Sequence, residues 1–133
     1  MLLPMRSGAG KVVLVIDDEA DVRGLLKQML EATGFAVILA ADGLAGAAAF
    51  RDPANAVDVV LLDLSMPRQG GVETFRQLRA VDPAAKVILT TGFGPNAAAT
   101  DFEGLSAILI KPFRVQELVD AVFRVLQPGE SMA

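Results

Sequence analysis

Short runs of apolar residues alternate along the chain with segments in which apolar residues recur every three or four positions. A continuous, mostly β-branched apolar run is typical of a strand that is buried on both faces of a parallel sheet. The run from Val12 to Ile16 is the clearest example, and Asp17 and Asp18 end it. The other runs that predict strands are 35–40, 57–62, 86–90 and 106–110.

Between these runs the apolar spacing is that of amphipathic helices. One helix is predicted from Ala20 to Gly34, which supplies a left-handed stop, and another over 114–126, ahead of Pro128. Shorter patterns predict helices over 43–50, ended by Pro53, and over 71–80. The weakest pattern is the alanine-rich stretch 96–102.

Five strands that alternate with five helices predict an α/β fold, a single doubly wound domain. Its five-stranded parallel sheet has right-handed crossovers and helices on both faces. The length, 133 residues, also fits one domain. We expect the domain to cover residues 11–127, after a flexible leader (1–10) and before a tail (128–133).

Composition narrows the chemistry. The chain has no cysteine and no histidine, which excludes disulfides, thiolate nucleophiles, imidazole bases and histidine–metal sites within it. Its net charge is −4 and its basic residues are scattered, so we expect no direct binding of nucleic acid. The apolar opening from Met1 to Met5 is too short for a membrane span or a signal peptide. We therefore expect a cytoplasmic domain without membrane contact.

The residues that end the predicted strands share a chemistry. Because parallel strands end at the same edge of a sheet, and functional groups gather there, these side chains should converge on one crevice. They are Asp17, Asp18, Asp63, Thr91 and Lys111.

Three adjacent carboxylates repel one another unless a cation neutralises them, and oxygen ligands alone favour a hard ion such as Mg²⁺. With the metal in place, one carboxylate can attack a phosphoryl donor while the metal, a hydroxyl and an ammonium bind the phosphoryl oxygens. Asp63, Thr91 and Lys111 fit these three protein roles. Each residue also has a structural alternative: Asp17 and Asp18 as a helix cap, Asp63 as the start of a turn, Thr91 as a cap or as a residue that lines the sheet, and Lys111 as a solvated strand end.

The motifs around these residues resemble the receiver domain of two-component response regulators, a CheY-like module of bacterial phosphorelays. The likeness spans about residues 11–127. It is carried by Val-Leu-Val-Ile-Asp17-Asp18-Glu19, Val-Leu-Leu-Asp63-Leu-Ser-Met-Pro67 with Gly70-Gly71, Ile-Leu-Thr-Thr91-Gly92, and Lys111-Pro112-Phe113. The resemblance implies a flavodoxin-like (βα)5 fold with strand order 2-1-3-4-5.

The resemblance also implies the roles of the site residues. Asp63 is phosphorylated by the phosphohistidine of a sensor histidine kinase or a histidine phosphotransfer protein. Mg²⁺ is held by Asp18, Asp63 and the backbone carbonyl of Ser65, with Asp17 acting through a water. Thr91 and Lys111 bind the phosphoryl oxygens, and movement of Thr91 changes the conformation of the domain. A cis peptide bond is implied before Pro112.

Two departures from the family pattern and one apolar loop residue qualify the resemblance. Ile108 stands where the family often has tyrosine or phenylalanine, so the aromatic switch coupled to the threonine is missing. The weak 96–103 segment favours a monomer or a weak homodimer. Phe93 lies two residues after Thr91, where an apolar side chain would shield the phosphate of Asp63 from water; packing on the surface is the alternative. The 91–93 and 102–105 stretches are similar to receivers of hybrid sensor kinases.

We therefore expect a signalling switch that catalyses only its own phosphorylation and dephosphorylation, and not a metabolic enzyme. One alternative is a receiver-like module that binds partners without phosphorylation. Another is an aspartyl-phosphate phosphohydrolase of the haloacid dehalogenase type. Those enzymes have a second aspartate two residues after the nucleophile, where this chain has Ser65.

Overall fold

The computed structural model describes residues 8–64, 70–92 and 104–126. Five strands form one sheet in the order β2-β1-β3-β4-β5, and every neighbouring pair is parallel. The predicted parallel sheet and its implied strand order are thus confirmed. The strands are β1 (Val12–Ile16), β2 (Ala36–Ala40), β3 (Val59–Asp63), β4 (Val87–Thr91) and β5 (Ala107–Ile110).

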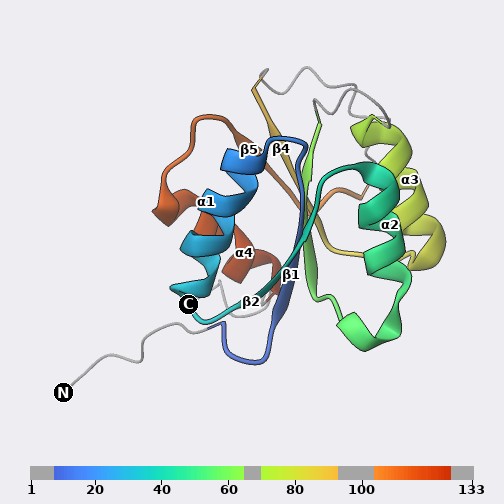
Figure 1. Ribbon diagram of the computed structural model, residues 1–133, viewed down its shortest axis with the longest axis horizontal. Coiled ribbons are helices and arrows are strands. Elements are labelled where there is room, and N and C mark those ends of the chain that lie inside the picture. The colour runs from blue at the N-terminus through green and yellow to red at the C-terminus, as the bar shows by residue number, and fades with distance from the viewer. Residues whose placement is uncertain (1–7, 65–69, 93–103, 127–133) are drawn as a thin grey trace.

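Helices cover both faces of the sheet, so the domain has three layers (Figure 1). On one face lie α1 (Ala20–Glu31) and α4 (Val115–Leu126), and on the other lie α2 (Gly43–Arg51) and α3 (Gly71–Val81). A 3₁₀ turn, Pro53–Asn55, follows α2. The four helices agree with the sequence pattern to within a few residues. The helix predicted over 96–102 falls outside the described residues.

The sheet separates two apolar clusters because successive side chains of a strand point to opposite faces. Val13 and Val15 of β1 pack with α1 and α4, whereas Leu14 and Ile16 pack with α2 and α3. All five residues of β3 and all five of β4 are buried. The continuous apolar runs of the sequence are therefore strands covered on both faces, as their composition predicts.

Two glycines show why α1 ends and α2 packs where it does. Gly34 has a φ of +100°, the left-handed conformation that stops the chain after α1. Gly46 lies in α2 against Ile16 of β1, and a Cβ at this position would collide with the isoleucine side chain. The missing side chain thus lets α2 approach the sheet closely.

The chain enters the domain through a turn at residues 8–10. The amide of Gly8 donates to the carbonyl oxygen of Thr33 at 2.8 Å, and Gly8 packs on the ring of Phe35. The extents of the leader and the tail stay predictions, because residues 1–7 and 127–133 are outside the described ranges. Within those ranges, no helix has both the length and the apolar character needed to cross a bilayer.

Candidate functional site

The predicted site residues lie at one edge of the sheet. Asp17 follows β1 directly, and Lys111 follows β5 directly. Asp63 and Thr91 are the last residues of β3 and β4, so each of these strands ends one residue later than the sequence pattern indicates. Strand order reverses between β1 and β3, which are neighbours in the sheet, and ligands of open α/β sheets bind in the crevice beyond such a point.

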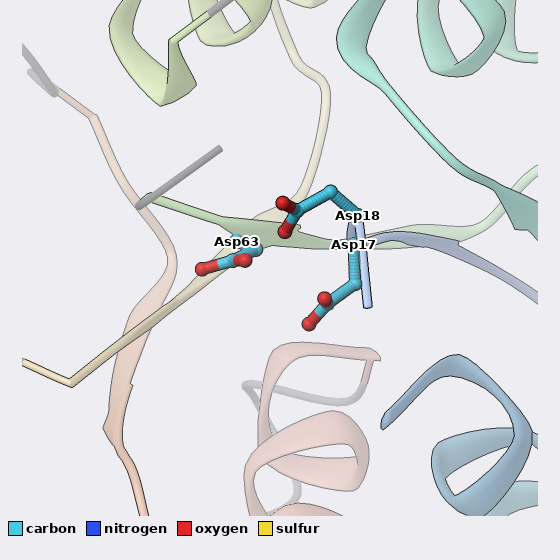
Figure 2. Close-up of side chains that lie close together, drawn as sticks. All are labelled: Asp17, Asp18 and Asp63. Carbon is cyan, nitrogen blue, oxygen red and sulfur yellow. The ribbon is translucent and has the colours of Figure 1, made fainter. Parts of the chain in front are cut away.

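Three carboxylates meet in this crevice (Figure 2). One oxygen from each of Asp17, Asp18 and Asp63 lies within 4.8 Å of the others. Asp17 and Asp63 are almost completely buried, at 2% and 1% relative exposure, whereas Asp18 is exposed. Two carboxylates thus form the floor of the cluster and one faces solvent.

Lys111 provides the positive charge of the cluster. Its Nζ donates to Oδ2 of Asp17 at 3.2 Å and lies 3.7 Å from Oδ1 of Asp63. The backbone of Lys111 is tied to β4, because its amide donates to the carbonyl oxygen of Thr91 at 2.7 Å. The peptide bond between Lys111 and Pro112 is cis, as the resemblance implies. The side chain of Lys111 therefore reaches into the crevice from the strand end.

The surroundings of Asp17 have opposing effects on the pKa of its carboxyl group. Burial raises the pKa of its carboxyl above the usual value of 3.8, and the nearby charge of Asp63 raises it further. The hydrogen bond from the Glu19 amide and the charge of Lys111 lower the same pKa, but they do not offset the burial. Without a metal ion, the negative charge of Asp17 is therefore disfavoured by its surroundings.

Thr91 lies beside the acceptor strand. The register pairs Asp63 with Thr90, so Thr91 is one residue further toward the crevice on the neighbouring strand. Its side chain is buried, at 1% exposure. This position allows a threonine hydroxyl to contact a group attached to Asp63, which is the role the sequence assigns to it.

Not every predicted residue can be located. Ser65, whose backbone carbonyl is expected to bind the metal, and Phe93, expected to shield the phosphate, both lie outside the described residues. Ile108 is described: it lies on β5 with 42% of its surface exposed. The position where the family often has an aromatic residue is thus a solvent-facing isoleucine.

One contact of the site could not be predicted from any motif in the sequence. Nη1 of Arg23, on α1, donates to the backbone carbonyl oxygen of Asp17 at 2.9 Å. Arg23 precedes the glycine of an amphipathic helix and belongs to none of the motifs above. Only the path of α1 over the end of β1 brings its guanidinium to this loop.

The donor set fits a hard divalent cation. Carboxylate oxygens converge from two strand ends, and one of the three carboxylates is open to solvent, which leaves a path for an ion to enter. Such oxygen ligands suit Mg²⁺, and a cation would offset both the mutual repulsion of the three carboxylates and the cost of burying the charge of Asp17. Asp17, Asp18 and Asp63 are therefore the residues that could hold the metal.

Comparison with known proteins agrees with this geometry. Residues 13–123 match the response regulator receiver domain family. The chemotaxis protein CheY of Thermotoga maritima is 29% identical over 119 residues, which cover 87% of this chain and 98% of CheY. The transcriptional regulatory protein CpxR of Escherichia coli K12 is 33% identical over 116 residues. That match covers 86% of this chain but only 49% of CpxR, so the chain spans about half the length of such relatives.

Solved structures show the same fold. A response regulator receiver domain protein from Clostridium thermocellum superposes with a TM-score of 0.82 at 31% identity, covering 92% of this chain and 99% of its own. The response regulator TrrA of Thermotoga maritima, in complex with Mg²⁺-BeF, has a TM-score of 0.79 at 30% identity and covers 87% of this chain and 99% of its own. Sequence, fold and the acidic edge of the sheet thus agree that this chain belongs to the response regulator receiver domain family.

Proposed function

We propose that this chain is a phospho-acceptor switch in which Asp63 receives a phosphoryl group from a partner histidine kinase or histidine phosphotransfer protein in a Mg²⁺-dependent reaction. The observation that carries the proposal is the arrangement of Lys111 and the three carboxylates at one sheet edge. Membership of the receiver family supports the general role, because the family consists of response regulator receivers.

Two structural relatives support the metal and the phosphoryl group. TrrA was solved with Mg²⁺-BeF, and CheY of Borrelia burgdorferi was solved with CheX, BeF₃ and Mg²⁺, at a TM-score of 0.81 and 26% identity, covering 89% of this chain and 90% of its own. Beryllium fluoride bound to a carboxylate oxygen is tetrahedral, as a phosphoryl group is. A Mg²⁺ ion and a phosphoryl group together would likewise suit the acidic cluster of this chain.

In the proposed transfer, the phosphoryl group moves from the partner's imidazole to Asp63. An oxygen of Asp63 attacks the phosphorus of the donor, a phosphorus–oxygen bond forms, and the phosphorus–nitrogen bond to the partner's imidazole breaks. The bonding electrons return to that nitrogen, and the ring leaves neutral because its other nitrogen carries a proton. Bound Mg²⁺ would neutralise the negative charge that gathers on the carboxylates and the phosphoryl oxygens.

Lys111 and Thr91 complete the site. Because the ammonium of Lys111 is already 3.7 Å from Oδ1 of Asp63, it is placed to bind an oxygen of a phosphoryl group attached to Asp63. The hydroxyl of Thr91, from the adjoining strand, is assigned the same task. These bonds exist only in the phosphorylated state, so they bias the domain toward a second conformation.

In this proposal the chain has no separate substrate and catalyses only its own phosphorylation and dephosphorylation. An aspartyl-phosphate phosphohydrolase is disfavoured because Ser65 occupies the place of its second aspartate. A binding module that is never phosphorylated is disfavoured because Asp63 and Lys111 are held together at the edge of the sheet. The proposal also includes a histidine kinase or phosphotransfer protein as the partner, a monomer or weak homodimer as the assembly, and a cytoplasmic location.

Intact mass is the direct test, because the chain has no tryptophan and no tyrosine to report by fluorescence. The protein would be incubated with phosphoramidate, a small donor with a phosphorus–nitrogen bond, in Mg²⁺ or in chelator. We expect one added phosphoryl group with Mg²⁺ and none in chelator. Asp63→Asn should abolish it, and Asp21→Asn, an exposed aspartate of α1, should not. No adduct on the wild type would favour the unphosphorylated binding module.

A further inference from the structure

Arg23 holds the loop that carries two of the three carboxylates. It lies in the first turns of α1, and its backbone amide donates to the carbonyl oxygen of Glu19 at 3.0 Å. Its side chain reaches back past the start of the helix, where Nη1 donates to the carbonyl oxygen of Asp17 at 2.9 Å. Hydrogen bonds from a charged donor are among the stronger ones in proteins.

The carbonyl that Arg23 binds belongs to the peptide bond between Asp17 and Asp18. Asp17 is fixed at three further points: its amide donates to Ala40 at 3.1 Å, and its carboxylate accepts from the Glu19 amide at 2.9 Å and from Lys111 at 3.2 Å. The side chain of Asp18 is exposed, and it has no hydrogen bond to the residues that the structure describes. The direction of its carboxylate therefore depends on its own rotamer and on the backbone before it, which Arg23 contacts.

The start of α1 offers little else to fix this turn. Glu19 occupies the N-cap position, and its side chain makes no capping hydrogen bond. Serine, threonine, aspartate or asparagine at that place would usually supply one. The turn is held instead by the carboxylate of Asp17 on the Glu19 amide and by Arg23 on the Asp17 carbonyl.

We propose that Arg23 is a positioning residue that fixes the Asp17–Asp18 peptide, keeps the Asp18 carboxylate turned toward Asp17 and Asp63, and thereby strengthens divalent-cation binding at the cluster. Figure 2 shows the Asp18 carboxylate turned toward Asp63, as this arrangement requires. The inference rests on the proposed function, because the cation is the one that the phosphoryl transfer would use.

The sign of the effect separates positioning from simple electrostatics. A guanidinium beside a cation site repels the cation, so charge alone predicts that removal of Arg23 makes Mg²⁺ bind more tightly. Positioning predicts the opposite, because an Asp18 that is free to turn away has to be ordered when the metal binds. Loss of a residue that orients metal ligands commonly weakens affinity by 10-fold to 100-fold.

The test is calorimetric titration of the whole chain with Mg²⁺. Arg23→Gln should raise the dissociation constant about tenfold, and Arg23→Lys, which keeps a donor, should recover part of the affinity. The matched control is Lys27→Gln, one turn along α1, which removes an equal charge whose partner is Glu31 rather than the loop. We expect Lys27→Gln to leave the constant nearly unchanged.

A second readout separates positioning from a general loss of structure. For Arg23→Gln, phosphorylation by phosphoramidate should require more Mg²⁺ but reach the wild-type rate at saturation. If Arg23→Gln unfolds, Gly24→Ala, which is expected to stabilise α1, is added to both Arg23→Gln and Lys27→Gln, and the two are compared again. Mg²⁺ affinity in Arg23→Gln that equals or exceeds that of Lys27→Gln would overturn the inference. A wild type that gains no phosphoryl group although it binds Mg²⁺ would refute the proposed function and leave the role of Arg23 in metal binding intact.

Discussion

Lys111 and Asp17 form a hydrogen-bonded ion pair of 3.2 Å although 94 positions separate them in the sequence. The aspartate is almost completely buried, and the lysine keeps 22% of its side-chain surface exposed. The same ammonium is 3.7 Å from the carboxylate of Asp63. The ammonium of Lys111 thus interacts with two buried carboxylates. We expect this arrangement to affect both the stability of the fold and the chemistry of the crevice.

Lys111→Met should destabilise the metal-free protein by about 2–4 kcal/mol at neutral pH, because removing one partner leaves buried charge without compensation. Lys111 lowers the pKa of Asp17, so the variant should raise that pKa further above 3.8. A raised pKa in the folded state means that folding favours the protonated carboxyl. The loss of stability in Lys111→Met should therefore be complete above the pKa of Asp17 in the folded variant. It should shrink as the pH falls from there toward 3.8, because Asp17 becomes protonated in both folded proteins.

Urea unfolding of wild type and Lys111→Met in chelator, followed by circular dichroism between pH 4 and 8, measures this difference. Lys27→Met is the control, because its pair with Glu31 is on the surface and should be worth well under 1 kcal/mol. A loss for Lys111→Met that stays constant across this pH range would contradict the electrostatic explanation.

Asp18→Asn should have opposite effects without and with metal. It removes one of three adjacent negative charges, so the metal-free protein should become more stable, by up to about 1 kcal/mol for so exposed a group. It also removes a metal ligand, so added Mg²⁺ should stabilise the variant less than the wild type. Thermal unfolding over a series of Mg²⁺ concentrations should show that the stability curves of the wild type and of Asp18→Asn cross. Parallel curves would show that Asp18 is not a metal ligand.

Gly24→Ala should stabilise the protein by about 0.5–1 kcal/mol. Gly24 lies inside α1, a Cβ there would meet no atom within 4 Å, and alanine costs less backbone entropy in a helix. Gly46→Ala is the matched comparison in α2, where the new methyl group would press on Ile16. It should destabilise by about 1–3 kcal/mol. Equal effects from the two substitutions, measured by chemical unfolding, would contradict the packing described here.

Arg79→Ala should weaken the attachment of the segment that leads into β5. Nη2 of Arg79, on α3, donates to the carbonyl oxygen of Gly104 at 2.6 Å, and the guanidinium carbon lies 4.8 Å from the centre of the Phe75 ring. Loss of both contacts at this partly buried position should cost about 1 kcal/mol. Arg124→Ala, at an exposed position of α4, should cost almost nothing in the same unfolding measurement. A loss for Arg79→Ala no larger than for Arg124→Ala would show that the contact does not hold the segment.

Local pattern was sufficient for most of the architecture. β1 and β3 read as buried strands because uninterrupted apolar runs are compatible with coverage on both faces, and α1 and α4 read as helices because their apolar stripes are regular. Strand ends were less certain: Asp63 and Thr91 proved to be the last strand residues. Hydrogen bonds to neighbouring strands decide those limits, and the apolar pattern does not record them.

The sequence by itself determined which chemistry is present: carboxylates, a hydroxyl and a lysine at strand ends, with no thiol and no imidazole. It also placed them at one edge, because parallel strands end on the same side of a sheet. Only the tertiary structure decided that Asp17 and Asp63 are buried while Asp18 is open, that Lys111 bridges the two buried groups, and that Arg23 grips the loop between strand and helix. Burial and such contacts depend on how distant elements pack, and no local spacing encodes that packing.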